Sequence, residues 1–335
     1  MQCSRRAVLP PGSIGGYNCD VPARVLITGA TGVLGFHLYR RWREDDGVRL
    51  MVAVRPGTPE LPGAIRLEMD LAEPDEVATV LRGEEFDLVV HAAALTNPDE
   101  CERKPALAQR VNVEATGRLL EALAPTARVV YISTDLVFDG TCGRYTEEDP
   151  VNPVNWYGMT KVAAEELVLA RPNGVVVRVS KLFSWGSPFH PCFGNWLEEG
   201  FHRGTPVPLF ADQYRTPLYV LDAVSALERF LTLHPRHAVY HLGGRERMNR
   251  YEFGRYFAEA LGYSADAIRP IRMQEAGLAP RGADCSLVSD RFCGEFGFAP
   301  RPVREALRDL ATRPNWWRDG CPEIPVSSAG AGGSR

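Results

Sequence analysis

Short apolar runs alternate with helix-like stretches along the first half of this 335-residue chain, and this alternation restricts the possible folds more than any other feature. The runs contain almost no polar residues, which is typical of parallel strands covered on both faces. The stretches between them carry apolar residues at helical spacing. The expected strands are 24–28, 50–54, 88–91, 129–133 and 175–179, and the expected helices are 32–45, 105–123 and 157–170. Strand–helix alternation predicts right-handed βαβ units and a doubly wound parallel α/β sheet.

Beyond about residue 180 the character of the chain changes. Proline and glycine become frequent, and long connections separate helices expected near 191–202, 220–233, 250–262 and 303–312. We interpret this part as a smaller, irregular α/β lobe over the carboxyl ends of the strands, where such sheets bind ligands. The predicted organisation is a disordered leader at 1–23, a nucleotide-binding domain at 24–180, a mainly substrate-binding lobe at 181–315 interleaved with it, and a disordered tail at 316–335.

Three glycines follow the first expected strand directly and open the first expected helix. They are Gly29, Gly32 and Gly35, with Thr31, Val33 and Leu34 between them. Glycine at these points allows a tight turn, a close approach of the backbone to a pyrophosphate, and close packing of helix on strand. The N–H groups and the positive end of the helix would bind the phosphates. Strand, glycines and helix agree, so we expect a dinucleotide cofactor in a Rossmann-type fold.

The residue after the second expected strand indicates which dinucleotide is bound. A carboxylate at this point would accept hydrogen bonds from a ribose 2′-hydroxyl, whereas a cation suits a 2′-phosphate. The sequence has Arg55 there. This favours NADP(H) and leaves NAD(H) open, since a solvated arginine after a strand is the ordinary alternative.

A tyrosine and a lysine four residues apart, Tyr157 and Lys161, lie on one face of an expected helix. A phenol with its usual pKa of about 10 transfers protons slowly near neutral pH, and a nearby ammonium is expected to lower that pKa. The phenol could then protonate a carbonyl oxygen while a hydride reaches the carbon. A hydroxyl at the end of the preceding strand, that of Ser133 or Thr134, could donate a hydrogen bond to the developing alkoxide, and capping of the strand end is the ordinary alternative.

The glycine loop and these hydroxyl and ammonium groups resemble the extended short-chain dehydrogenase/reductase superfamily. One branch is especially similar, the dTDP-4-dehydrorhamnose reductases. The similarity rests on Ser133-Thr-Asp-Leu-Val-Phe-Asp-Gly140, on Tyr145-x-Glu147-x-Asp149-x-x-x-Pro153, and on Tyr157-Gly-x-x-Lys161. It extends over about residues 24–312 and includes a late Ala279-Pro-Arg…Ser286-Leu stretch.

The resemblance implies a role for each matching position. Tyr157 would donate the proton, Lys161 would tune it and hold the nicotinamide ribose, and Thr134 would bind the carbonyl. Further cofactor contacts would come from Gly29, Thr31, Gly32, Val33, Leu34, Gly35, Arg55, Asp70, Leu71, Ala92, Ala93, Ala94, Thr96 and Asn112. Asp135, Lys181 and Arg215 would face the substrate, with Arg215 gripping a nucleotide-sugar diphosphate. A salt bridge between the lobes is the alternative for Arg215, and an ordinary buried helix residue is the alternative for Asn112.

The chain departs from this branch on the substrate side. Lys181 stands where rhamnose-type reductases have a tryptophan that packs on the sugar, and Leu136 replaces the usual tyrosine. The predicted activity is therefore NAD(P)H-dependent reduction of a 4-keto (deoxy)sugar nucleotide, with the sugar left open. Two alternatives remain: a nucleotide-sugar epimerase or dehydratase of the same superfamily, and a non-catalytic NADP-binding regulatory subunit resembling that of methionine adenosyltransferase.

Composition excludes other classes of function. The net charge of −4 leaves no basic footprint for nucleic acid. No apolar run approaches the roughly 20 residues of a membrane span. The eight cysteines form no Cys-x-x-Cys pair and no zinc-like cluster, so we expect reduced thiols, a cytoplasmic protein and no metal. The resemblance also suggests a homodimer that pairs through the helices carrying Asn112 and Tyr157.

Overall fold

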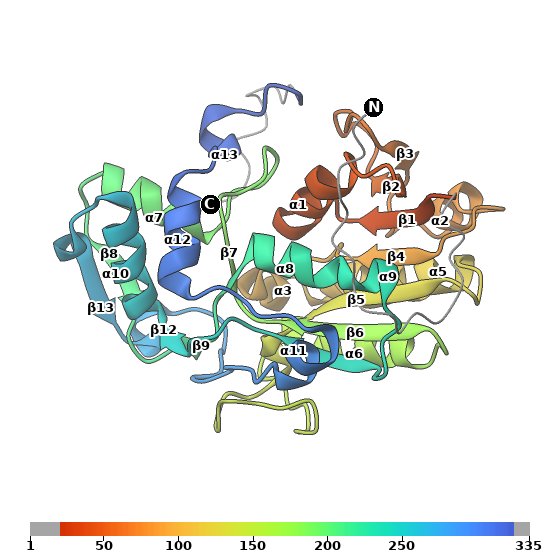
Figure 1. Cartoon of the computed structure of the whole chain (residues 1–335). Coiled ribbons are helices and arrows are strands. Elements are labelled where there is room, and N and C mark those ends of the chain that lie inside the picture. Colours follow the sequence, from red (N-terminus) through yellow and green to blue (C-terminus); the bar gives the residue numbers. More distant parts are fainter. Residues whose placement is uncertain (1–20, 325–335) are drawn as a thin grey trace.

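The structure, a computed structural model, describes residues 21–324, and a parallel seven-stranded sheet forms its centre (Figure 1). The strands run in the order β11-β6-β5-β4-β1-β2-β3, and every neighbouring pair is parallel. Chain order reverses between β1 and β4, which opens a crevice at the carboxyl ends of these two strands. The strands are β1 (Ala23–Thr28), β2 (Val48–Val54), β3 (Ile65–Glu68), β4 (Leu88–His91), β5 (Arg128–Thr134), β6 (Gly174–Val179) and β11 (Val239–Leu242).

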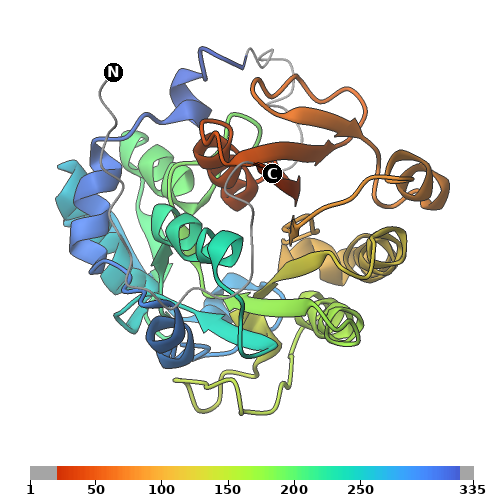
Figure 2. The same ribbon diagram turned by 45° about the vertical axis from the view of Figure 1, so that its right-hand side comes forward.

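Helices cover both faces of the sheet because its strands are apolar on both faces. Along β1, Val25 and Ile27 belong to one hydrophobic core, whereas Leu26 between them belongs to the other. The first core includes residues of α1 (Val33–Trp42) and α8 (Val220–Leu227), and the second includes residues of α2 (Pro74–Val80), α5 (Ala115–Ala122) and α6 (Trp156–Leu169). Figure 2 shows these two helical layers on opposite sides of the sheet. The doubly wound α/β fold is thus confirmed.

The second half of the chain builds a lobe beside the sheet, at the left of Figure 1. Three short strand pairs support it: β7 (Leu182–Phe183) with β10 (Leu218–Tyr219), β8 (Val207–Phe210) with β13 (Ile268–Ile271), and β9 (Tyr214–Arg215) with β12 (Met248–Asn249). Its helices are α7 (Phe193–His202), α10 (Arg250–Leu261) and α12 (Val303–Ala311). The other helices of this part of the chain pack on the sheet domain: α9 (Arg229–Thr232) follows α8, α11 (Asp290–Phe296) lies against β11, and α13 (Trp316–Asp319) contacts α1. Short 3-10 turns lie at η3 (Ala265–Ala267) and η4 (Met273–Ala276).

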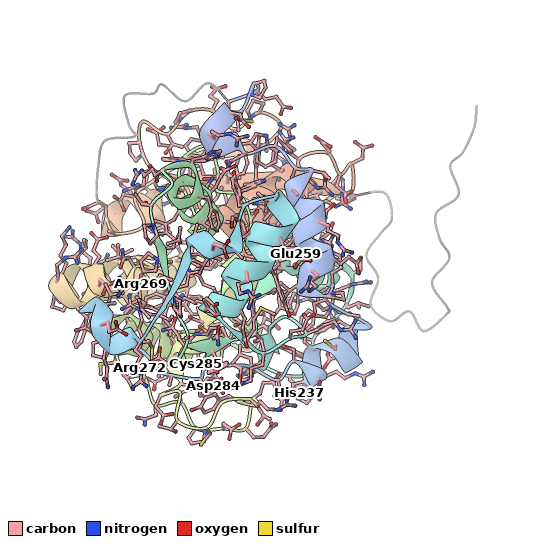
Figure 3. All side chains as sticks on the ribbon, turned by 90° about the vertical axis from the view of Figure 1, so that its left-hand side faces the viewer. His237, Glu259, Arg269, Arg272, Asp284 and Cys285 are labelled. Atoms are coloured by element: carbon pink, nitrogen blue, oxygen red, sulfur yellow. The ribbon has the colours of Figure 1, made fainter. Side chains whose placement is uncertain are left out.

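One segment of the lobe crosses back to the sheet domain. Asp284 and Cys285 of this segment lie close to the loop of residues 139–152 (Figure 3). A Cβ added to Gly140 would be 2.5 Å from the Gly282 Cα, so the two backbones touch. Asp99, on the sheet side, pairs with Arg281 at 2.5 Å. The segment 279–285 therefore ties the two halves together beside the crevice.

Three details differ from the sequence expectations. The stretch 105–123 is a continuous helix only in part, because α4 (Pro105–Gln109) and α5 are joined by η1, a π-helical turn (Arg110–Glu114). The strand β11 comes from the lobe region but completes the central sheet beside β6. Residues 316–324 were expected in a disordered tail. They instead form α13 and a turn whose Cys321 and Ile324 are buried. Residues 1–20 and 325–335 lie outside the described part, so the remaining expectations for the ends stay untested.

Candidate functional site

The glycine loop forms a tight cradle at the carboxyl end of β1. Gly29 has a φ of +71°, and a Cβ there would lie 2.7 Å from the Ala93 backbone nitrogen. A Cβ on Gly35 would lie 2.2 Å from the Gly29 carbonyl oxygen. No side chain caps the N-terminus of α1 at Gly32. The uncapped N–H groups and the lack of side chains fit a diphosphate at this point.

The loop that follows β4, residues 92–96, forms the opposite wall of this cradle. Asn112 holds it: its side-chain oxygen accepts a hydrogen bond from the Leu95 N–H at 2.7 Å, and its amide donates to the Leu95 carbonyl at 3.1 Å. The same amide donates to the Thr160 hydroxyl on α6 at 3.0 Å. The π-helical turn η1 carries Asn112, as such turns often do near functional sites. Asn112 thus joins the cofactor wall to the helix of Tyr157, which adds a positioning role to the predicted one.

A pocket of about 540 Å³ lies beyond the end of β2, and Arg55 and Asp70 are among the residues that line it. Within residues 21–324 the Arg55 guanidinium makes no ion pair, and the side chain is exposed. Asp70 accepts the Ala72 N–H at 2.9 Å. Glu73 and Glu76 also line this pocket, so one guanidinium faces three carboxylates. Arg55 and Asp70, both predicted to contact the cofactor, thus line one pocket.

The predicted reactive groups meet at the carboxyl end of β5. Thr134 ends β5, and its hydroxyl lies within hydrogen-bonding reach of the buried Tyr157 phenol at the start of α6. Burial, with a smaller contribution from the Asp135 carboxylate, raises the pKa of Tyr157 well above its usual value. The hydroxyl of Thr134 also donates to Asp135 Oδ1 at 3.2 Å and accepts the Leu136 N–H at 3.2 Å. A phenol in these surroundings holds its proton at neutral pH.

Lys161 is oriented differently from the expectation. Its ammonium donates to the Ile132 carbonyl at 2.7 Å and lies 3.9 Å from the centre of the Tyr131 ring. Burial lowers the pKa of Lys161 to about 7, and the carboxylate of Glu165 partly opposes that shift. The expected lowering of the Tyr157 pKa by Lys161 is therefore not seen in this structure, because the ammonium is directed at the strand backbone.

A buried ion pair lies next to the reactive groups and connects the elements that carry them. Glu165, one turn after Lys161 on α6, pairs with Arg178 of β6 at 2.8 Å. The Ser133 hydroxyl, next to Thr134, donates to the same carboxylate. This network connects α6 with the ends of β5 and β6, and so fixes the relative position of Thr134 and Tyr157.

On the substrate side, Arg215 is already engaged. Its Nε lies 3.3 Å from Asp135 Oδ2, and its terminal nitrogens donate to the Gly282 carbonyl at 3.2 and 3.3 Å. The Ser180 hydroxyl donates to Asp135 Oδ2 at 3.1 Å. The salt bridge between the halves, the alternative for Arg215, is thus what this structure contains. Its grip on a diphosphate remains a prediction.

Sequence reasoning missed two polar side chains next to Arg215. They are Gln213 and Arg250, which line a pocket together with Lys181. Neither belongs to a recognisable catalytic motif, so no local signal in the sequence identified them. Among the described residues, no group of three or more His, Cys, Asp or Glu side chains could hold a metal ion. No helix in residues 21–324 is both long and apolar enough to span a membrane.

The model of one protein family, the RmlD substrate binding domain, matches residues 23–315. The chain belongs to this family. The match spans the sheet and the lobe together, so both halves follow the pattern of the RmlD family. The family resemblance inferred from the motifs around Ser133 and Tyr157 is thus confirmed for the family as a whole.

Curated relatives of this RmlD-family chain include proteins of different roles. Methionine adenosyltransferase 2 subunit beta of Mus musculus is 31% identical over 309 residues, covering 89% of this chain and 91% of the relative. The spore coat polysaccharide biosynthesis protein SpsK of Bacillus subtilis is 30% identical over 293 residues, covering 85% and 96%.

Two solved structures show the same fold. The dTDP-4-dehydrorhamnose reductase of Bacillus anthracis, in complex with NADP, superposes with a TM-score of 0.73 at 23% identity, covering 87% of this chain and 99% of that one. MoeE5, in complex with UDP-glucose and NAD, gives a TM-score of 0.70 at 29% identity, covering 86% and 97%.

Proposed function

We propose that this RmlD-family protein is an NAD(P)H-dependent reductase of a 4-keto sugar nucleotide. The observation that carries the proposal is the contact between Thr134 and the protonated Tyr157 phenol, beside a glycine cradle suited to a dinucleotide. Bound at that cradle, the nicotinamide cofactor supplies a hydride to the carbonyl carbon. NADP(H) is the favoured cofactor and NAD(H) remains open, in agreement with structural relatives that contain one or the other.

The residues of the chain supply the proton and orient the carbonyl group. The Thr134 hydroxyl donates a hydrogen bond to the carbonyl oxygen and stabilises negative charge on it. Tyr157 gives its proton to that oxygen as the hydride arrives, so a ketone becomes an alcohol. Burial keeps the Tyr157 phenol protonated, which is the form that can give a proton to the carbonyl oxygen.

The substrate class is proposed from the family and from the charges of the lobe. MoeE5, at 29% identity, was solved with a nucleotide sugar. The lobe contributes Lys181, Arg215 and Arg250 to the substrate side, and these cations suit an anionic ligand. A homodimer through α6 also remains a proposal, supported by the 45% exposure of Met159 and the 38% exposure of Leu167 on that helix.

The test of the proposed function is consumption of NADPH by the purified protein in the presence of an enzymatically prepared dTDP-4-keto-6-deoxy sugar. Saturable turnover, with one alcohol formed per NADPH oxidised, is expected. The assay is repeated with a panel of keto sugar nucleotides and with NADH. Tight NADPH binding without turnover on the whole panel would contradict the reductase proposal.

A second candidate function is a regulatory, non-catalytic role. It is supported by the identity of about 30% to methionine adenosyltransferase 2 subunit beta, which extends over most of both chains. A protein of this kind would bind NADP and a partner enzyme. Its test is capture of a methionine adenosyltransferase catalytic subunit by the NADP-loaded protein, together with a change in that enzyme's rate. Absence of both effects would exclude the role.

A further inference from the structure

A small pocket lies in the lobe next to the reactive groups, between the start of α10 and the segment that follows β6. Its walls are mainly apolar and include Phe183, Phe193 and Phe253. Its polar side chains are Lys181, Gln213, Arg215, Asn249 and Arg250. We call this the cationic pocket, because it contains three basic side chains and no acidic one.

Two of its cations have no anionic partner in hydrogen-bonding contact. Among the described residues, neither the Lys181 ammonium nor the Arg250 guanidinium makes a hydrogen bond or an ion pair. Both lie over the ring of Phe193, at 5.6 Å and 5.5 Å from its centre. Arg215 is different, because Asp135 neutralises it. Two unpaired positive charges therefore flank one aromatic ring.

This arrangement is electrostatically unfavourable without a ligand. Burial, followed by repulsion from Arg215, lowers the pKa of Arg250 to about 10. The surrounding protein, followed by repulsion from Arg250, lowers the pKa of Lys181 to about 8, even though solvent reaches part of this side chain. Lys181 is exposed and Arg250 is half-buried, so the missing counter-charge is unfavourable mainly at Arg250. Perturbed groups of this kind are concentrated at functional sites, where a ligand supplies the missing charge.

The pocket also contains an unused hydrogen-bond acceptor. Gln213 is completely buried, and its side-chain oxygen has no hydrogen-bond partner among the described residues. The amide nitrogen of Gln213 is directed at the sulfur of Met273, 3.2 Å away. A buried acceptor without a donor is uncommon and requires an explanation. An O–H group on a ligand would satisfy it.

The pocket is close to the strand end that carries Thr134. Thr134 pairs with Val179 across β5 and β6, and Lys181 follows Val179 by two residues. Ser180, between them, bonds to Asp135, the immediate neighbour of Thr134. Two extended residues span about 7 Å at most. The backbone of Lys181 in the cationic pocket therefore lies close to the end of β5, where Thr134 is.

We infer that the cationic pocket binds a carboxylate flanked by a hydroxyl group, so that the substrate is a keto sugar acid. Lys181 and Arg250 bind the carboxylate, and Gln213 accepts a hydrogen bond from the hydroxyl. This inference rests on the proposed function and specifies its substrate class. The same two cations could bind a nucleotide diphosphate, and the titration described next separates the two anions.

The test uses two nucleotide sugars that differ only at C6, UDP-glucuronic acid with a carboxylate and UDP-glucose with a hydroxymethyl group. Each is titrated by calorimetry into the full-length protein saturated with NADP⁺, so binding is measured without turnover. We expect the wild type to bind UDP-glucuronic acid at least tenfold more tightly, as charge-assisted hydrogen bonds imply. Lys181→Met and Arg250→Met should each abolish most of this preference without changing the affinity for UDP-glucose by more than about twofold.

Arg255→Met is the matched control, because Arg255 lies on the same helix, is exposed and is outside the pocket. It should leave the preference intact. Arg250→Lys retains the charge and should recover part of the preference, even if the methionine variant folds poorly. Equal wild-type affinities, or no binding of either sugar, would overturn the inference. Equal weakening of both sugars by the two variants would also overturn it, since that result assigns the cations to the diphosphate. Failure of the NADPH assay would instead contradict the proposed function.

Discussion

The two walls of the site are built in different ways. On the sheet side, the glycine loop 29–35 and residues 92–96 present backbone to the cofactor, and Asn112 holds this wall through hydrogen bonds that are all satisfied. On the lobe side, the wall presents charged side chains, and within residues 21–324 Lys181 and Arg250 have no counter-charge in contact. One wall consists of groups that satisfy one another, whereas we propose that a ligand completes the other.

This difference has a physical consequence. A backbone wall recognises a group common to many cofactors, the diphosphate, and it tolerates no added atoms. A wall of unpaired charges lowers stability, but it binds an anion strongly and so determines specificity. We therefore expect changes to the sheet-side wall to damage cofactor binding and folding. Changes to the lobe-side wall should alter the choice of substrate.

The largest effect is expected where the two walls meet. Tyr157→Phe removes the proton donor and should lower turnover by about 10²–10⁴, the usual contribution of a positioned acid. NADPH binding, measured by fluorescence titration, should be retained. Tyr219→Phe is the control: its hydroxyl bonds to Asp309 at 2.8 Å, away from the site, so stability should fall slightly while turnover stays constant. Unchanged turnover in Tyr157→Phe would remove this residue from the mechanism.

Gly35→Ala tests the backbone wall. The added Cβ would lie 2.2 Å from the Gly29 carbonyl oxygen, so the loop must shift. We expect a loss of stability of about 1–3 kcal/mol and at least a tenfold weaker affinity for NADPH. Gly117→Ala is the matched control, since its Cβ would meet nothing closer than 3.7 Å and alanine suits a helix better. Similar behaviour of the two variants in urea unfolding and NADPH titration would contradict the role of the cradle.

Two buried histidines in the central sheet are neutral, one in a strand from the first half of the chain and one in a strand from the second half. Burial lowers the pKa values of His91 in β4 and His241 in β11 to about 3, from 6.5. Below pH 6.5 these histidines bind protons in the unfolded chain but not in the folded protein. The free energy of unfolding therefore decreases as the pH is lowered. At pH 5 the loss is roughly 2 kcal/mol for each histidine.

Urea unfolding at pH 7.5 and pH 5 measures this loss. His241→Gln should remove its own share of the pH dependence, whereas replacement of the exposed His202 should not. Equal stability at both pH values would refute the assignment of neutral, buried rings.

The smallest effect is expected at the outer end of the sheet-side wall. Arg55→Asp should shift the ratio of NADPH to NADH efficiency toward NADH by about tenfold, because a charge-assisted bond to the 2′-phosphate is lost. Carboxylates already present in that pocket, among them Asp70, limit the contribution of Arg55. Arg49→Asp, at the other end of β2, is the control. An unaltered ratio in Arg55→Asp would contradict binding of the 2′-phosphate.

Much of the architecture follows from local sequence. The strand at 88–91 was predicted with the observed bounds, and the glycine loop lies between strand and helix as expected. The π-helical turn that carries Asn112 was not predicted, because its apolar spacing is close to that of an α-helix. The edge strand β11 was also missed. Its four residues form a strand only because β6 offers an unpaired edge.

The sequence predicted Tyr157 and Lys161 as reactive groups, and Thr134 through the family resemblance; by itself it determined the parallel sheet and the cofactor loop. These features depend on periodicity and on residues close together in the chain, so neighbouring residues specify them. Only the tertiary structure decided which charges are neutralised. It brings Asp135 to Arg215, directs Lys161 toward the Ile132 carbonyl, and gives Arg250 aromatic neighbours but no ion pair among the described residues. Charge pairing depends on which distant segments meet and on how much water they exclude, and no local pattern of residues contains that information.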